Sequence, residues 1–222
     1  MNLSVEEIRE QMAHGDPGKR MAALVALRFI DEDAAAPILV EAAADPIPLV
    51  RVYAAIGLGK KRGVGTFELL TSLLNEDKDA SVRAEAAGSL GYYRDQNAVE
   101  YLVRSYYEDM DWIVRYSVIV SLGQLRDERG YSVLRSALTS ETEMIRDAAI
   151  SALGELGNAQ AIEVLLPMIS SEDSEVRRRV GQALGAIGTS ECRSPLNYLV
   201  KDEDPTVAEF ARYALAKLDE AH

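Results

Sequence analysis

The stretch DMDWIVRYSVIVSLGQL, residues 109–125, contains the pattern that decides the fold. An arginine, Arg115, follows an aliphatic residue at −1 and precedes a leucine at +7 and a glycine at +8. The same register recurs along the chain at intervals of 31 or 32 residues. The anchor positions are Arg20, Arg51, Arg83, Arg115, Arg146, Arg177 and Ala208. Self-similarity at such a period is typical of proteins that stack small repeated units.

Each repeat carries one apolar stripe with helical spacing. An aliphatic residue at −1, a small or β-branched residue at +3 and a leucine at +7 fall on one helix face. The leucine is present in all seven repeats, as Leu27, Leu58, Leu90, Leu122, Leu153, Leu184 and Leu215. Between these stripes, segments such as 67–75 and 161–170 also repeat apolar residues at three and four. The sequence therefore predicts an all-α, right-handed α-solenoid of about seven helical hairpins, because a single hairpin cannot bury its apolar face alone.

The repeat also predicts local features. One domain, 1–222, is expected to contain units near 2–31, 32–62, 63–94, 95–126, 127–157, 158–188 and 189–220. Aspartates at −6, such as Asp109, are expected to cap the following helix. The glycines from +8 onward are expected to end it near a turn. The anchor arginines are expected to form a ladder, each binding carboxylates or helix ends of a neighbouring unit, with solvated arginines as the alternative.

Composition excludes several classes of protein. The chain has 24 basic and 36 acidic residues and a formal charge of −12, so nucleic acid is not an expected partner. No apolar run approaches the roughly 18 residues of a transmembrane helix. The N-terminus lacks the basic and apolar regions of a secretory signal. A single cysteine, Cys192, rules out an internal disulfide and suits a cytoplasmic location.

Recognisable catalytic and metal-binding motifs are missing from the sequence. The two histidines, His14 and His222, do not form a paired motif, so no metal site and no tightly bound cofactor are expected. Cys192 falls sixteen residues before an anchor, in the same register as Ala161 and Gly130, which favours a buried, unreactive thiol over a nucleophile. The stretch 59–65, GKKRGVG, follows a predicted helix and is interpreted as a turn rather than a phosphate-binding loop.

Two stretches make the family resemblance specific. IRDAAISALGELG (145–157) and VRRRVGQALGAIG (176–188) are close to the pattern V-R-x-x-A-A-x-x-L-G-x-L-G and depart from it mainly at the two alanine positions. This pattern resembles the short HEAT-like repeats of the phycobilin lyases of the E/F type, a family whose homologues include a protein of phycobilisome degradation. The resemblance covers essentially the whole chain. It implies binding of phycobiliprotein subunits and detachment or holding of their bilin chromophore, with phycocyanobilin as the candidate ligand.

The second helix of each hairpin is expected to line the concave side, with positions +1 and +5 facing outward. These positions are apolar in the first four repeats and mainly polar in the last three. Exposed apolar surface of this kind marks an interaction site. The alternative is that these positions are partly buried between neighbouring helices. The residues predicted to form a groove for a ligand or partner are Tyr53, Ile56, Tyr92, Trp112, Tyr116 and Val120.

Two functions remain open at this stage. One is a bilin lyase homologue, for which Arg178 and Arg179 are candidates to bind the bilin propionates, although they equally fit the ladder or the surface. The other is a non-enzymatic scaffold that binds a partner protein through the same concave face. The apolar first half of the predicted groove favours the former, and the lack of an acid–base constellation favours the latter. The sequence identifies no catalytic residue.

Overall fold

The computed structural model describes residues 3–220, so the first residue of the expected first repeat, Asn2, and His222 lie outside the described residues. Over the described range the chain forms fourteen α-helices joined by short loops, and no strand. It divides into two compact units, one up to Ser121 and one from Leu122. Each unit is a stack of helical hairpins with its own buried core, which confirms the predicted all-α solenoid class.

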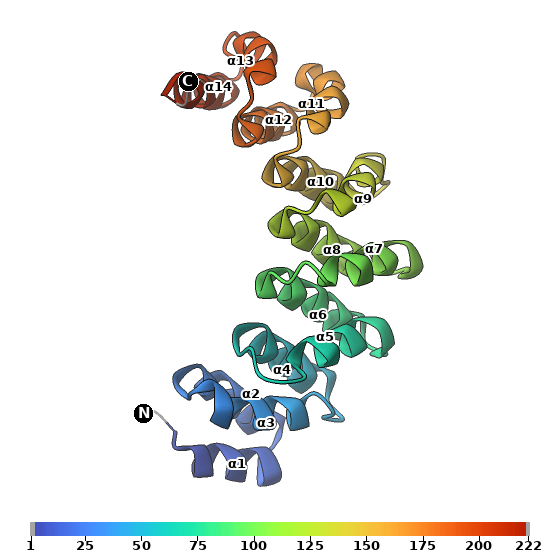
Figure 1. Cartoon of the computed structure of the whole chain (residues 1–222), viewed down its shortest axis with the longest axis vertical. Coiled ribbons are helices and arrows are strands. Elements are labelled where there is room, and N and C mark those ends of the chain that lie inside the picture. The colour runs from blue at the N-terminus through green and yellow to red at the C-terminus, as the bar shows by residue number, and fades with distance from the viewer. Residues whose placement is uncertain (1–2, 221–222) are drawn as a thin grey trace. The chain divides into compact units, whose positions relative to one another are not determined.

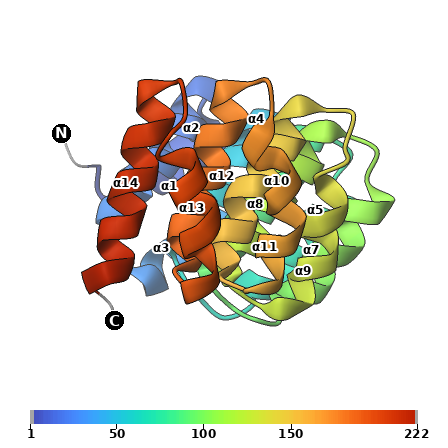
Figure 2. The ribbon, with the colours of Figure 1, turned by 90° about the horizontal axis from the view of Figure 1, so that it is seen from above.

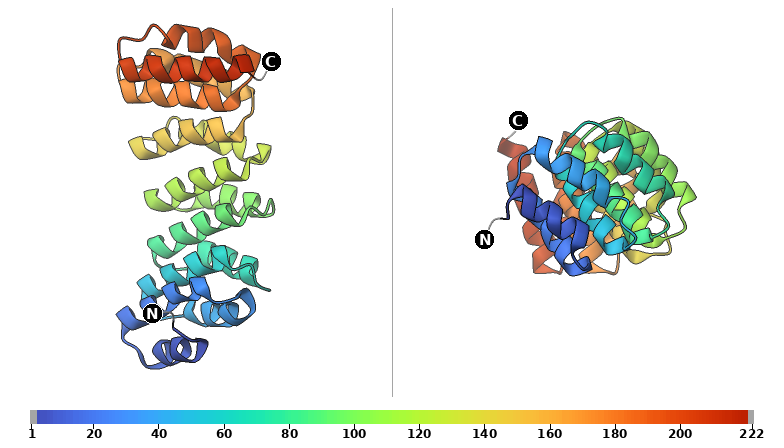
Figure 3. Two further views of the ribbon diagram at one scale, coloured as in Figure 1. Left: turned by 90° about the vertical axis from the view of Figure 1, so that its left-hand side faces the viewer. Right: turned by 90° about the horizontal axis from the view of Figure 1, so that it is seen from below.

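The helices of each unit lie in two layers (Figure 1). The first unit holds α1 (Val5–His14), α2 (Pro17–Ala26), α3 (Glu32–Ala42), α4 (Pro48–Lys60), α5 (Thr66–Glu76), α6 (Ala80–Tyr93), α7 (Ala98–Glu108) and most of α8 (Trp112–Leu125). The second unit holds the last residues of α8. It also holds α9 (Tyr131–Ala137), α10 (Glu143–Leu156), α11 (Gln160–Leu165), α12 (Ser174–Ile187), α13 (Arg193–Leu199) and α14 (Pro205–Glu220). Within a unit, successive even-numbered helices pack against one another and odd-numbered helices cover them. Figures 2 and 3 show this for the second unit, where α13 lies against both α12 and α14.

The repeat register fixes where each even-numbered helix begins. All seven start three residues before the anchor, at Pro17, Pro48, Ala80, Trp112, Glu143, Ser174 and Pro205. The predicted cap at −6 is wrong, because the side chains that accept a backbone N–H at these helix starts stand at −4. Asp16, Asp79, Asp111, Asp173 and Asp204 occupy that place. An N-cap residue must directly precede the first residue of the helix. The position of the helix start therefore determines that the aspartate at −4, and not the one at −6, is the cap.

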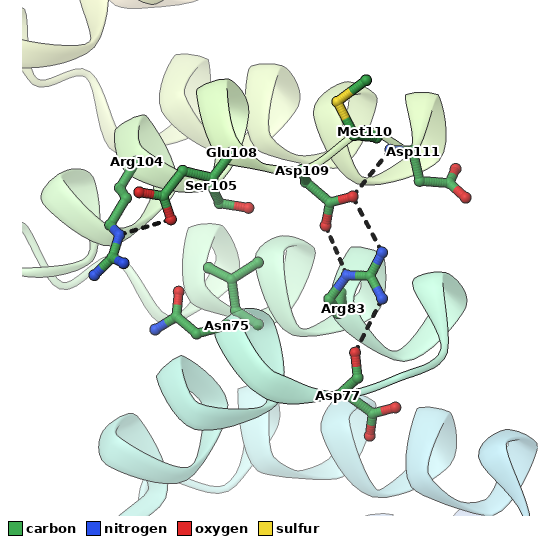
Figure 4. A pocket seen from close by; sticks show the side chains of 10 residues that line it. Asn75, Asp77, Arg83, Arg104, Ser105, Glu108, Asp109, Met110 and Asp111 are labelled. Carbon is green, nitrogen blue, oxygen red and sulfur yellow. Dashed lines mark hydrogen bonds and ion pairs between the residues drawn. The ribbon is translucent and has the colours of Figure 1, made fainter.

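The aspartates at −6 instead join successive hairpins. In Figure 4, Asp109 binds Arg83 through both oxygens, with Nε–Oδ2 2.6 Å and Nη2–Oδ1 3.1 Å. Asp109 Oδ1 also accepts the backbone N–H of Asp111, at 2.9 Å. On its other side Arg83 Nη1 donates to the carbonyl of Asp77, at 2.9 Å. Each guanidinium therefore ties the turn of its own hairpin to the turn of the next.

The expected ladder is confirmed at four anchors. The pairs are Arg20–Asp45, Arg51–Asp77, Arg83–Asp109 and Arg177–Asp202. It is wrong at Arg115 and Arg146, neither of which forms an ion pair within residues 3–220. Their guanidinium groups bind backbone carbonyls of their own hairpin instead. In the four confirmed pairs the aspartate stands at −6 of the following repeat. For Arg115 and Arg146 that position is Ser140 and Ser171, respectively, and serine offers no carboxylate.

The expectation that the glycine-rich close ends the helix is confirmed at Gly157 and Gly188, which cap α10 and α12 in the left-handed conformation, but the glycine at +8 itself lies inside its helix. A Cβ at Gly91 would lie 2.6 Å from the Cβ of Ser121 on α8, and one at Gly154 would lie 2.6 Å from the Cα of Ala183 on α12. Glycine at +8 is thus required by the close approach of successive even-numbered helices. Four of these helices end three residues later, at left-handed residues Arg94, Arg126, Gly157 and Gly188.

Candidate binding surface of the first unit

The predicted groove positions are mostly half-buried. Among the apolar +1 and +5 positions of the first four repeats, Ile56, Tyr116 and Val120 have intermediate exposure, Ala84 is buried, and Val25 is exposed, at 44%. The alternative of partial burial between neighbouring helices therefore describes these positions better than open exposure. A half-buried apolar side chain still has area to lose to a partner, so the residues remain candidates for binding.

Three of the predicted residues lie along one face of α8. Trp112, Tyr116 and Val120 are spaced by four, which places them on successive turns of the same side. Trp112 is the first residue of the helix and is 46% exposed. It follows Asp111, whose Oδ1 caps the helix by accepting the N–H of Ile113 at 3.1 Å. The cap explains why the helix starts there, and the exposed indole is not needed for it.

Tyr92 is exposed, at 61%, but it does not join the α8 residues in a compact site. Ser121 of α8 lies level with Gly91 of α6, because their side-chain positions are in contact. Trp112 stands nine residues before Ser121 and is thus level with Val82 of α6. Tyr92 is ten residues beyond Val82, which at 1.5 Å per residue is about 15 Å along the helix axis. Trp112 and Tyr92 therefore mark opposite ends of this face.

Tyr53 and Ile56 line a pocket between α2 and α4. Its volume is about 160 Å³, and its walls are mainly apolar. Lys60 and Lys61 stand at its edge, and Lys61 Nζ is fixed by donating to the carbonyl of Ile30 at 2.5 Å. The remaining lining residues are Leu24, Val25, Leu27, Arg28, Leu39 and Gly57. The structure thus brings two of the predicted groove residues together in a defined pocket bordered by cations.

Glu85 is a candidate that the sequence interpretation missed. It is half-buried on α6, two residues after the anchor Arg83. Burial raises the pKa of the Glu85 carboxyl above its ordinary value, and the positive charge of Lys60 opposes part of that shift. The only signal in the sequence is a carboxylate among small residues, in the segment 84–88. A carboxyl with a raised pKa beside apolar surface is suited to exchanging a proton with a bound ligand.

Arg178 and Arg179 belong to the second unit and are paired by carboxylates of that unit. Arg178 Nε lies 2.8 Å from Glu175 Oε2, and its guanidinium lies 5.5 Å from the ring centre of Phe210. Arg179 Nη2 lies 3.0 Å from Glu175 Oε1, and its Nε lies 3.6 Å from Asp147 Oδ2. A propionate would have to compete with Glu175 for both arginines. Their predicted role in binding bilin stays a prediction.

An open pocket of about 650 Å³ lies along the Arg–Asp ladder and includes the paired groups Arg83, Asp109, Arg104 and Glu108 (Figure 4). Those charges already neutralise one another. Cys192 is fully buried, as predicted. Between residues 3 and 220 no group of three or more histidine, cysteine, aspartate or glutamate side chains could hold a metal ion.

The family follows from a comparison with protein-family models. The model for HEAT repeats matches residues 42–123, 105–172 and 162–222, which is most of the sequence. The chain belongs to the HEAT-repeat family. No curated protein matches it in a sequence comparison. Among the described residues no helix is both long and apolar enough to cross a bilayer.

Several solved structures share the HEAT fold. The complex of CpcE and CpcF of phycocyanin lyase from Nostoc sp. PCC7120 matches with a TM-score of 0.63 and 22% identity, covering 98% of this chain and 96% of that one. A HEAT-like repeats protein from Thermococcus onnurineus NA1 gives 0.59 and 14%, covering 98% of both chains. A chain of the Kap95p–RanGDP structure gives 0.68 and 11%, covering 98% of this chain and 36% of that one. At these identities the similarity establishes the fold and nothing finer.

Proposed function

We propose that this protein is a homologue of the phycobilin lyases that binds phycobiliprotein subunits and detaches or holds their bilin chromophore during phycobilisome degradation. The observation that carries the proposal is the stripe of Trp112, Tyr116 and Val120 on α8. Aromatic and aliphatic side chains on one helix face suit a flat tetrapyrrole and the apolar surface around it. The resemblance of the repeats to the E/F-type lyases, and the fold shared with CpcE and CpcF, support the same proposal.

Under this proposal the protein does not need a nucleophile of its own. The thioether sulfur belongs to a cysteine of the phycobiliprotein, and Cys192 of this chain is buried, so the bilin would not be transferred to it. Glu85, on α6, offers a carboxyl whose pKa is raised by burial. Such a group would hold or deliver a proton at a bilin placed against α6 and α8. Lys60 lies close enough to influence that carboxyl and would also attract a propionate.

The direct test mixes the purified protein with phycocyanobilin and, separately, with holo-phycocyanin, and records absorbance spectra over time. We expect a spectral shift with the free bilin and loss of the holo-phycocyanin band as the chromophore is detached or held. No shift with free bilin and no change in holo-phycocyanin would contradict the proposal.

A double variant tests the surface itself. Ile56→Glu with Val120→Glu places two charges on half-buried positions, where water still reaches them. We expect helix content to stay unchanged by circular dichroism and binding of holo-phycocyanin to weaken about tenfold or more. The matched control is Val40→Glu with Val64→Glu, which adds the same charges at two exposed positions. A loss of helix content in the first variant only would show that its positions belong to the core.

A second candidate function is a scaffold that binds a partner protein without changing its chromophore. The observation that favours it is the size of the α2–α4 pocket, about 160 Å³, which is far smaller than a tetrapyrrole and close to one side chain. Binding of both apo- and holo-phycocyanin with an unchanged chromophore spectrum would support the scaffold and rule out the lyase activity.

A further inference from the structure

The packing rule that joins successive even-numbered helices is broken once. At five junctions a glycine at +8 lies against a small residue at +6 of the next helix. The pairs are Gly59–Ser89, Gly91–Ser121, Gly123–Ala152, Gly154–Ala183 and Gly185–Ala214. At the junction of α2 with α4 both positions differ, because Arg28 stands at +8 and Gly57 at +6. The α-helix α2 has already ended there, at Ala26, and a 3₁₀ turn, Leu27–Phe29, follows.

The pocket between α2 and α4 lies at this break. Arg28 is too large for the glycine position and turns outward, with its guanidinium 4.3 Å from the ring centre of Phe29. Gly57 brings no side chain of its own, and a Cβ there would clash with Leu39. Both residues line the pocket of about 160 Å³, together with Tyr53 and Ile56. The side chain of Leu39 lies against Gly57 instead and forms part of the pocket wall.

Charge distinguishes this pocket from its surroundings. The protein has a net charge of −12, yet Arg28, Lys60 and Lys61 all border the pocket. Lys61 is held by the carbonyl of Ile30, whereas Lys60 and Arg28 are exposed. A local cluster of cations in an acidic protein attracts an acidic partner and disfavours a second copy of the same acidic chain.

The volume of the pocket limits the size of the group that can bind in it. Apolar cavities of about 150 Å³ hold a benzene-sized group. A leucine or phenylalanine side chain therefore fits, and it would contact Leu24, Leu39 and Ile56. An apolar side chain inserted in a desolvated pocket, with polar contacts around it, is the usual arrangement of an interface hot spot.

We propose that this pocket is the anchor site for an acidic segment of a partner protein, which inserts one leucine- or phenylalanine-sized side chain between α2 and α4. Carboxylates on either side of that side chain contact Lys60 and Arg28. The inference rests on the proposed function, because Tyr53 and Ile56 belong to the proposed partner-binding surface. The inference goes beyond that function by naming the site at which the partner is anchored and the chemical character of the anchoring segment.

The test uses the full-length protein and a fluorescent pentapeptide with phenylalanine between two pairs of glutamates, followed by fluorescence anisotropy. Two control peptides replace the phenylalanine by alanine or the glutamates by lysines. We expect saturable binding of the acidic phenylalanine peptide and about tenfold or weaker binding of both controls. Equal binding of the phenylalanine and alanine peptides would overturn the anchor, and equal binding of the lysine peptide would overturn the charge argument.

Two variants locate the binding on the protein. Lys60→Glu reverses a charge at the rim, and its matched control, Lys78→Glu, makes the same change at an exposed lysine that does not line the pocket. Val25→Trp enlarges an exposed lining residue so that it covers the mouth. We expect Lys60→Glu to weaken peptide binding about five- to tenfold, Val25→Trp to abolish it and Lys78→Glu to have less than a twofold effect. Equal effects of the two lysine variants, or a peptide-induced dimer on size exclusion, would overturn the proposal.

Failure of this inference is separable from failure of the proposed function. If holo-phycocyanin binds and Val25→Trp leaves that binding unchanged, the anchor pocket is refuted while the function stands. If the peptide binds the pocket but phycocyanin and phycocyanobilin do not bind, the anchor stands and the proposed function is refuted.

Discussion

Two glycines of α6 lie one turn apart and have different physical roles. Gly91 faces α8, and a Cβ there would lie 2.6 Å from the Cβ of Ser121. Ser121 in turn donates its hydroxyl to the carbonyl of Ala87, at 2.8 Å. Gly88 stands on the predicted groove face, and a Cβ there would meet no atom within 4 Å. The sequence contains both glycines in the same helical context, and only the packing separates them.

We predict opposite effects of the same substitution at these two positions. Gly91→Ala should lower the free energy of unfolding by about 1–3 kcal/mol, since α6 and α8 must move apart. Gly88→Ala should raise it by about 0.5–1 kcal/mol, because alanine is the better helix former and has room. Urea unfolding monitored by circular dichroism measures both. Equal changes of the same sign would show that the close approach of α6 and α8 does not control stability.

Trp112 shows what the repeat register explains and what it leaves open. The register predicts that α8 begins at this position, which other repeats fill with Pro17, Pro48 and Pro205, and the structure confirms the start. It gives no reason for an indole there. With 46% of its surface exposed, Trp112 contributes less to the core than its size allows. Its place at the end of the α8 stripe is the reason that it is part of the proposed partner-binding surface.

At the scale of elements, the Arg–Asp ladder holds neighbouring hairpins in register. Burial alone would raise the pKa of Asp109, but hydrogen bonds from Arg83 and from the backbone of Asp111 hold it below its ordinary value. The pKa of Asp77 is lowered in the same way by Arg51, again against the effect of burial. The charged forms of these carboxylates are therefore favoured in the folded state.

The sign of the resulting pH dependence follows from these lowered pKa values. A carboxyl whose pKa is lower in the folded state contributes stability above its unfolded pKa of about 3.9, and that contribution is lost as the pH falls through the folded value. We predict that the melting temperature is stable between neutral pH and about pH 5 and falls steeply below about pH 4. Thermal unfolding followed by circular dichroism across this range is the measurement.

A single substitution isolates one pair of the ladder. Asp109→Asn should reduce stability at neutral pH by about 1–3 kcal/mol, because Arg83 loses a charged, bidentate partner. The deficit relative to the unmodified protein should shrink as the pH falls below about 4, because the contribution of the Asp109 carboxylate to stability is then progressively lost. Glu155→Gln, at an exposed position of α10, is the control and should have little effect at any pH. A deficit for Asp109→Asn that stays constant down to pH 3 would contradict this account.

The ladder was predictable from the sequence because arginine and aspartate recur at fixed positions in the repeat. The cause of its interruption at Arg115 and Arg146, the serines Ser140 and Ser171, is also present in the sequence. However, only the structure shows that each arginine pairs with the −6 residue of the following repeat. The capping residue was not predictable in the same way. Asp109 and Asp111 are two residues apart, and either can cap until the first residue of the helix is known.

At the scale of the whole molecule, the periodic sequence predicts the number of hairpins and their apolar cores, since these depend on local spacing. The exposure of +1 and +5 depends instead on how closely successive helices pack, and the prediction of an open groove was correspondingly less accurate. The α2–α4 pocket was missed although the departures from the repeat that line it, Arg28 and Gly57, are in the sequence. Departures from a repeat reveal a site only when the rule they break is known from the packing.

The central claim is that the even-numbered helices of the first unit bind a phycobiliprotein. Hydrogen–deuterium exchange of the full-length protein, alone and with holo-phycocyanin, tests it most directly. The account predicts slower exchange on binding in α4, α6 and α8, and unchanged exchange in α5 and α7. Protection confined to the odd-numbered helices, or no protection anywhere at saturating phycocyanin, would contradict it.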